Sequence, residues 1–87
     1  MIKNLSPLEK LVRQAFADHP GKKQRFAQSL GYKNLNNAFG LIYCCLRSGV
    51  DQQNILRNIQ KIFKIDEWNY DEAWHTTKIL VRQQTRI

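Results

Sequence analysis

Apolar side chains recur along most of the chain at spacings of three and four residues, the period that gathers them on one face of an α-helix. The first run opens with a strong helix start, in which Ser6 is expected to cap the helix, Pro7 occupies the first helical position and Glu9 follows. No segment shows a convincing strand pattern. The pattern therefore predicts an all-α fold, a small bundle of about five helices that contains a helix-turn-helix and forms a single domain over residues 1–87. The expected helices cover residues 7–18, 22–30, 35–47, 52–64 and 70–84.

Residues 22–47 carry the pattern around which the other helices are organised. Ala27 precedes Gly31 by four residues, the spacing of a helix-turn-helix. A small side chain at the first position lets the second helix cross closely, and glycine at the second can take the left-handed conformation that ends a helix. Asn34 or Asn36 is expected to cap the next helix.

The helix expected over residues 35–47 has two distinct faces. Its apolar stripe, which we expect to pack into the core, consists of Leu35, Ala38, Phe39, Ile42, Cys45 and Leu46. Its opposite face consists of Asn36, Asn37, Gly40, Tyr43, Cys44 and Arg47.

The end of the chain adds one more helix to the expected core. Residues 66–69 are expected to form a turn in which Trp68 folds back onto the core. Asn69 and Glu72 match a capping box for the last helix. The apolar side chains Trp74, Leu80 and Val81 exceed what a minimal four-helix core needs. They predict either a homodimer through the C-terminal helix or a surface for another partner.

The net charge indicates which class of molecule the protein is expected to bind. The chain carries 14 Lys and Arg against 7 Asp and Glu, a formal charge of +7 on 87 residues, and such a balance favours nucleic acid or an anionic membrane surface. No acidic residue lies between Asp18 and Asp51, a stretch that coincides with the expected helix-turn-helix. No helix combines a large apolar face with a cationic one, and no apolar run approaches the roughly 20 residues that span a bilayer, so we expect no membrane.

Catalytic or metal-binding chemistry is not indicated. Neither His19 nor His75 has a nucleophile or carboxylate partner at a useful spacing, and the adjacent Cys44 and Cys45 do not have the spacing of a metal site. We therefore expect no enzyme, no metal and no cofactor. Reduced thiols and the lack of a visible signal peptide predict a cytoplasmic protein, with Cys45 in the core and Cys44 partly exposed.

Residues 8–68 resemble the helix-turn-helix domains of phage repressors, of the lambda repressor and Cro type. The resemblance rests on the capped first helix, on Ala27-x-x-x-Gly31, on a recognition-type helix and on a following helix that ends in KIFKIDEW. Ala38 falls one place late against the usual pattern. The resemblance implies an all-α domain whose third helix enters the DNA major groove.

The polar face of this third helix carries the expected contacts. Asparagine can bond an adenine edge and arginine a guanine edge, while Gly40 leaves room either for DNA to approach or for a close helix crossing. The predicted base contacts are Asn36, Asn37, Gly40, Tyr43 and Arg47. The predicted phosphate contacts are Lys22, Lys23, Gln24, Lys33 and Asn34.

These features predict a sequence-specific protein that binds double-stranded DNA and regulates transcription. The alternative is a small basic protein-interaction module or inhibitor, for example of phage or mobile-element origin. It would dock on a nucleic-acid-binding complex through the same helix, because Gly40, Tyr43 and Cys44 form a face with little charge.

Overall fold

The computed structural model describes residues 5–85 of the chain, and the helices in this part follow one another with short connections. They are α1 (Pro7–Asp18), α2 (Pro20–Ser29), α3 (Leu35–Ser48), the 3₁₀ turn η1 (Gln52–Asn54), α4 (Ile55–Ile62) and α5 (Glu67–Thr85). No strand occurs among the described residues, so the predicted all-α bundle of five helices is confirmed.

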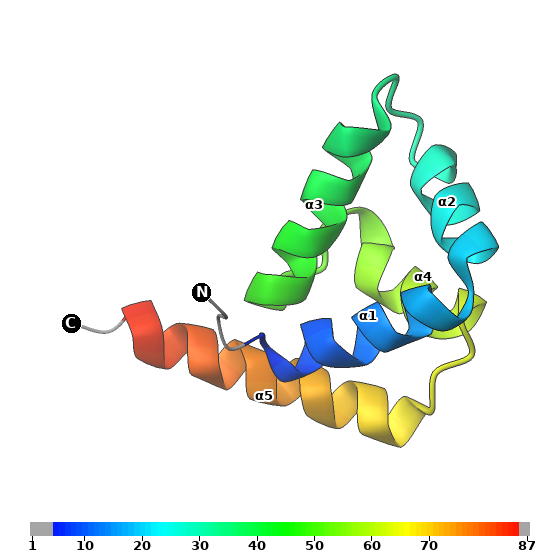
Figure 1. The fold of residues 1–87 in the computed structure, drawn as a ribbon. Coiled ribbons are helices and arrows are strands. Elements are labelled where there is room, and N and C mark those ends of the chain that lie inside the picture. Colours follow the sequence, from blue (N-terminus) through cyan, green and yellow to red (C-terminus); the bar gives the residue numbers. More distant parts are fainter. Residues whose placement is uncertain (1–4, 86–87) are drawn as a thin grey trace.

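Three helices form a triangle that the other two support (Figure 1). From the end of α1, α2 leads away to a turn, and α3 returns to the start of α1. The last helix, α5, runs back along α1 in the opposite direction, and α4 lies behind the triangle. This arrangement leaves one side of α3 without a neighbouring helix.

The start of α1 is fixed by the predicted cap and by two other helices. The Ser6 hydroxyl accepts the Glu9 backbone N–H at 3.0 Å and donates to the Leu46 carbonyl of α3, also at 3.0 Å. The Leu8 N–H donates to the Thr77 hydroxyl of α5 at 3.1 Å. Two backbone N–H groups that the start of α1 leaves unpaired are thereby satisfied, one by the neighbouring Ser6 and one by Thr77 from a distant segment. The first turn of α1 therefore joins α3 and α5.

The core lies inside the triangle and receives side chains from every α-helix. The predicted apolar stripe of α3 is confirmed, with Ala38, Ile42, Cys45 and Leu46 buried and Leu35 and Phe39 packed beside them. Ala27 is fully buried in α2, as the helix-turn-helix spacing requires. The other buried apolar side chains are Leu8, Val12, Phe16, Phe26, Ile55, Leu56, Ile59, Phe63 and Tyr70.

The turn between α2 and α3 follows the sequence pattern, while α2 begins earlier than predicted. Gly31 has a φ of 84°, and the Asn34 side chain caps α3 by accepting the Asn36 N–H at 2.9 Å. Pro20 ends α1 and also serves as the first residue of α2, because proline suits the first helical position. Lys22 and Lys23 consequently lie inside the first turn of α2.

The helix expected over residues 52–64 is interrupted at its start. Gln53 and Asn54 have φ values of 54° and 59°, in the left-handed region, so α4 begins only at Ile55. Asp51 acts as a cap across this turn, because its Oδ1 accepts the Leu56 N–H at 2.7 Å. The turn thus redirects the chain between α3 and α4 and leaves Ile55 and Leu56 fully buried.

The predicted turn before the last helix is wrong, because α5 begins at Glu67. The Asp66 carboxylate accepts the N–H of Asn69 at 2.9 Å and takes the capping role expected of Asn69. Tyr70 is 1% exposed, and its hydroxyl donates to the Leu56 carbonyl at 2.6 Å. Trp68 and Tyr70 are two positions apart, so their side chains leave the helix in directions about 200° apart. Trp68 therefore faces outwards at 76% exposure, so the prediction that it folds onto the core is wrong.

The C-terminal helix closes the core of its own chain. The half-buried Trp74 donates its indole N–H to the Gly49 carbonyl at 2.7 Å, and Thr77 is fully buried. Val81 is also half-buried, whereas Leu80 is 40% exposed. Of the three residues predicted to form a dimer or partner surface, only Leu80 is an exposed side chain. None of the helices in the described part has the length and apolar character needed to cross a membrane.

Candidate nucleic-acid interface

One side of α3 is open to solvent along most of its length. We call Asn36, Asn37, Gly40 and Cys44 the open face, since all of them are exposed. A Cβ added to Gly40 would meet no atom within 4 Å. The explanation that Gly40 permits a close crossing by another helix of this chain is therefore wrong. Glycine at an exposed position inside a helix costs about 1 kcal/mol relative to alanine, and no packing within the described chain offsets this cost.

The N-terminal end of the open face adjoins the turn that precedes α3. Lys33 is exposed there and forms no ion pair or hydrogen bond with any other described residue. Asn34 is exposed as well, although its side-chain oxygen is occupied by the Asn36 N–H. Two of the five predicted phosphate contacts thus lie beside the open face.

The other predicted phosphate contacts lie on α2, where two of them are held by the fold. The Lys22 ammonium donates to the Ile62 carbonyl at the end of α4 at 3.3 Å. The Lys23 ammonium lies 5.7 Å from the ring centre of Phe16 and 5.2 Å from that of Phe39. Both lysines are half-buried, whereas Gln24 is exposed. Lys22 and Lys23 therefore contribute to the packing of α2 in addition to their charge.

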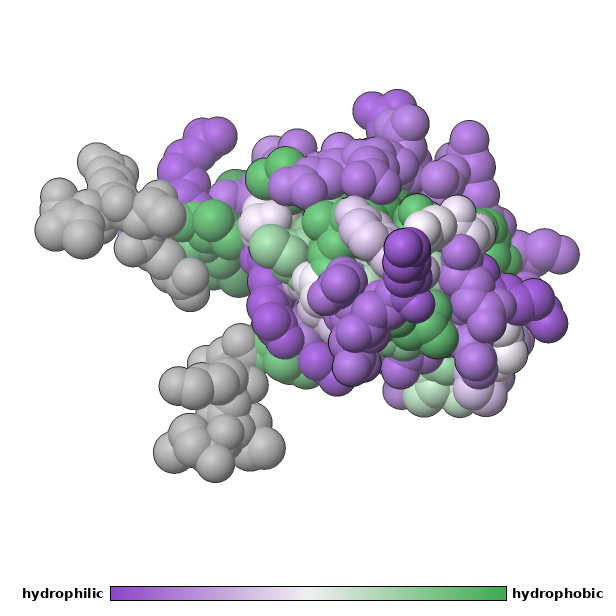
Figure 2. All heavy atoms as spheres, turned by 90° about the horizontal axis from the view of Figure 1, so that it is seen from above, coloured by the Kyte–Doolittle hydropathy of each residue, from purple (hydrophilic) through white to green (hydrophobic). Residues whose placement is uncertain are grey.

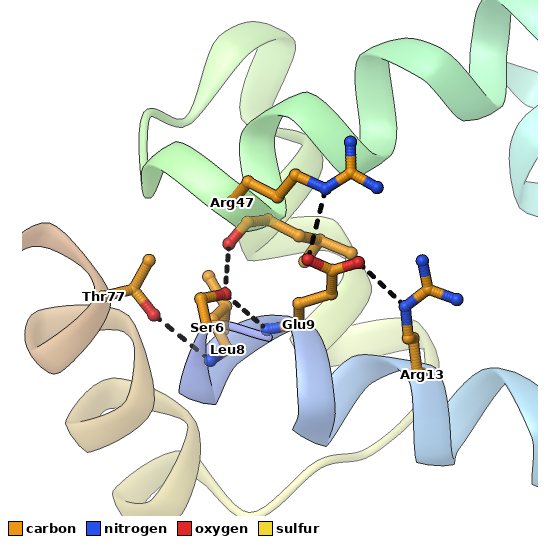
Figure 3. Close-up of polar contacts among 7 residues, drawn as sticks. Ser6, Leu8, Glu9, Arg13, Arg47 and Thr77 are labelled. Carbon is orange, nitrogen blue, oxygen red and sulfur yellow. Dashed lines mark hydrogen bonds and ion pairs between the residues drawn. The ribbon is translucent and has the colours of Figure 1, made fainter. Parts of the chain in front are cut away.

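The C-terminal end of α3 contacts α1 through a buried carboxylate (Figure 3). Glu9 is 1% exposed, and its Oε1 lies 3.3 Å from Nε of Arg47. Its Oε2 lies 2.8 Å from Nε of Arg13, one turn further along α1. The Tyr43 ring lies beside both arginines. The guanidinium carbon of Arg13 is 4.6 Å from the ring centre, and that of Arg47 is 5.9 Å from it. We call Arg13 and Arg47 the arginine pair.

The structure thus divides the predicted base contacts into two groups. Asn36, Asn37 and Gly40 lie free on the open face, while Tyr43 and Arg47 are engaged with α1. Glu9 and Arg13 are not among the site residues predicted from the sequence, which indicates only a helix-capping role for Glu9. Their separation of four residues, which places a glutamate and an arginine on one helix face, was the available signal.

The arginine pair is positively charged overall. A buried carboxylate must be paired, because an isolated ion in the interior is costly. Two guanidinium groups share the single carboxylate of Glu9, so one positive charge is left uncompensated at the surface. The Arg13 and Arg47 side chains are 43% and 63% exposed, respectively, and both are accessible to a partner.

Acidic side chains are concentrated far along the chain from α3. Of the seven Asp and Glu residues, Glu9 is buried and four lie between residues 66 and 72 at the start of α5. Seen from above, on the side of the turn between α2 and α3, the surface is largely hydrophilic, with hydrophobic residues only in separate areas (Figure 2). No large apolar patch is visible on that side.

The two adjacent cysteines lie in different environments. Cys44 is exposed and Cys45 is buried, as predicted, and both are free thiols. Burial raises the pKa of the Cys45 thiol, and the nearby Cys44 and Asp51 raise it further, while a hydrogen bond from the Gln52 backbone opposes the shift.

No group of three or more His, Cys, Asp or Glu side chains that could hold a metal occurs among the described residues. A cleft of about 290 Å³ between α4 and α5 carries opposite charges, including Arg57, Lys61, Glu67 and Asp71.

In comparisons with known proteins, no family model, curated protein or solved structure is significantly similar to the chain. The resemblance to phage repressors therefore stays a prediction.

Proposed function

We propose that this protein binds double-stranded DNA at specific sites, with α3 in the major groove, and acts as a transcriptional regulator. The observation that supports this proposal best is the open face of α3, where exposed amides flank a glycine with free space above it. The major groove is about 12 Å wide, and an α-helix with its side chains is about 10–12 Å across. A helix with one uncovered face suits such a groove.

Three residues of the open face, together with Lys33 beside it, have a role in this proposal. The Asn36 and Asn37 amides each offer a donor and an acceptor, the combination that pairs with an adenine edge. Gly40 lets a thymine methyl group or the DNA backbone come close to the helix. Lys33, beside the N-terminal end of α3, contacts a phosphate and fixes the orientation of the domain on the duplex.

The alternative of a protein partner on the same helix keeps one specific observation in its favour. Gly40 and Cys44 are exposed and uncharged, and a glycine also lets a partner helix pack closely. The two functions differ in their response to salt. DNA binding that releases counterions weakens steeply as salt rises, whereas a contact centred on Gly40 and Cys44 does not.

The first test is a fluorescence-anisotropy titration with random duplex DNA at several salt concentrations. We expect binding whose logarithm falls linearly with the logarithm of salt, by about 0.9 for each phosphate contact. A selection for the preferred site would follow. Absence of binding at low salt, for a protein with a charge of +7, would overturn the proposal and direct the search to protein partners.

A second test asks whether α3 is the helix that enters the groove. In a Cys45→Ala variant the only thiol is Cys44 on the open face, and we expect bound DNA to slow its alkylation. The matched control moves the only thiol to α5, by Trp68→Cys in a Cys44→Ala, Cys45→Ala background, where alkylation should continue. Equal rates at Cys44 with and without bound DNA would contradict docking through α3, even if the protein binds DNA.

A further inference from the structure

We propose that the arginine pair, held by Glu9 and Tyr43, is a binding site for one phosphate group. The proposed function identifies this group as a phosphate of the DNA backbone at the C-terminal end of α3, so the identity of the ligand rests on that function. The sequence pattern predicts that Tyr43 and Arg47 contact bases. The geometry points instead to phosphate binding by Arg47 and Arg13, with Tyr43 as a positioning residue.

The two guanidinium groups contact the Glu9 carboxylate in the same way. Arg13 and Arg47 each use Nε, and each of them contacts a different oxygen of the carboxylate. The terminal amino groups of both arginines are therefore left out of the ion pairs. In Figure 3 the Arg47 guanidinium lies above the Glu9 carboxylate and the Arg13 guanidinium lies to its right, and each dashed line to the carboxylate starts from Nε. No other hydrogen bond or ion pair engages them within the described chain.

The free terminal amino groups of the arginine pair match the oxygens of a phosphate. A guanidinium presents parallel N–H donors that pair with two oxygens at once, and phosphate is one of its preferred partners. The pair offers two such edges and one uncompensated positive charge. A carboxylate or a neutral ligand would not use both edges as fully as the several oxygens of a phosphate.

The site is held in place before any ligand arrives. Tyr43 lies near both guanidinium groups, and its ring packs edge-on against Phe16 with centres 6.3 Å apart and planes at 76°. Glu9 is buried, so the carboxylate that orients both arginines does not move freely. Side chains that are already ordered lose less conformational freedom on binding.

The site lies at the C-terminal end of α3. At about 1.5 Å per residue, Arg47 lies about 16 Å along the helix from Asn36, and the major groove is about 12 Å wide. If the Asn36 end reads bases, the Arg47 end reaches the sugar-phosphate backbone at the edge of the groove. Lys33 and the arginine pair would then anchor opposite ends of α3.

The first arm of the test measures DNA binding by charge-conserving variants. Arg13→Lys combined with Arg47→Lys keeps both charges and the pairing of Glu9 but removes the planar fork. We expect roughly tenfold weaker binding with a nearly unchanged salt dependence, because lysine binds phosphate only as a point charge. Arg13→Gln with Arg47→Gln should also lower the salt slope by about 1. Lys61→Gln, an exposed charge on α4, is the control and should change affinity less than about twofold.

The second arm uses the unaltered protein and inorganic phosphate, so that it depends neither on DNA nor on the stability of a variant. The Nε–H signals of the arginines are followed by NMR while phosphate is added, with sodium chloride of equal ionic strength as the reference. We expect the Arg13 and Arg47 signals to shift. The Arg57 signal should stay in place, although its Nε also faces a carboxylate, that of Asp51 at 3.5 Å.

The two arms separate failure of the site from failure of the function. DNA binding that is equally tight in the Arg13→Lys, Arg47→Lys variant would overturn the phosphate site and leave the proposed function standing. Phosphate-specific shifts without any DNA binding would support the site and overturn DNA as its source of phosphate. Shifts that chloride reproduces at Arg13, Arg47 and Arg57 alike would overturn the site, whatever the DNA result.

Discussion

At the scale of single residues, Gly40 lies in the middle of α3 with no atom near the place of a missing Cβ. Gly40→Ala should therefore raise the free energy of unfolding by about 1 kcal/mol, because alanine is the better helix former and meets no clash. For a domain of this size, the melting temperature should rise by about 4–8 °C. Thermal unfolding followed by circular dichroism measures this shift.

Gly40→Gln is the companion variant for the same position. Glutamine is also a good helix former, so the fold should remain at least as stable as in the unaltered protein. Its long side chain would cover the open face, and site-specific DNA binding should weaken by about tenfold or more. A lower melting temperature in either variant would mean that Gly40 is closely packed after all.

At the scale of the helices, the two tryptophans of α5 occupy opposite environments. Trp74→Ala removes a half-buried side chain and the hydrogen bond to Gly49, and should cost about 2–4 kcal/mol of stability. Trp68→Ala removes a side chain that is 76% exposed and should change stability by less than about 0.5 kcal/mol. Urea unfolding of both variants measures the difference. Comparable losses would place Trp68 in the core and contradict the start of α5.

Helix ends with strong local signals could be predicted from the sequence. Ser6 and Pro7 fix the start of α1, and Asn34 caps α3, because each of these signals acts within a few residues. The left-handed Gln53 and Asn54 could not be predicted, since neither is a glycine. The start of α5 was misplaced for another reason.

Two capping signals compete before α5, and burial decides between them. Asn69 with Glu72 matches a capping box, and Asp66 is an alternative cap that lies one turn earlier. The longer helix allows Tyr70 to reach the core and bond to Leu56. Short-range patterns contain no information about such a contact.

Only part of the candidate site could be predicted from the sequence. Helical spacing alone identified the exposed Asn36, Asn37 and Gly40. The engagement of Arg47 by Glu9 could not be predicted, because the two residues are separated by 38 positions along the chain. Only the packing of α1 against α3 brings them together.

At the scale of the whole molecule, α5 belongs to the core and is not an arm that is free to join two copies. It runs along α1, buries Tyr70 and Thr77, and ties Trp74 to the end of α3. Any dimer formed through this helix would have to use its outer side. The exposed apolar side chains there are Trp68, Ile79 and Leu80.

The stability of the whole domain should decline in alkali because two buried acids resist ionisation. Burial raises the pKa of Tyr70, with further contributions from the carboxylates of Asp51 and Asp71, and burial likewise raises that of Cys45. In the unfolded chain these groups ionise near their ordinary values of about 10 and 8.5. The unfolded state therefore loses protons first, so stability is complete below about pH 8.5 and falls above it.

Urea unfolding between about pH 7 and about pH 10.5 tests this decline. Tyr70→Phe should be less stable at neutral pH by about 1 kcal/mol, since the bond to the Leu56 carbonyl is lost. The variant should nevertheless lose less stability than the unaltered protein as pH rises through the upper part of this range. Parallel declines in the two proteins would show that Tyr70 is not responsible.

The two glycines with a positive φ should differ in whether other residues can replace them in homologues. At Gly31 a Cβ would meet nothing, so asparagine, which tolerates this conformation, is an acceptable replacement. At Gly49, with a φ of 79°, a Cβ would lie 2.8 Å from Cγ of Lys78 and 3.6 Å from Cδ1 of Trp74. Its carbonyl also holds the Trp74 indole. Homologues that have diverged over most of their length should therefore still share Gly49 and Trp74 at this separation, and that pair is the signature by which to look for them.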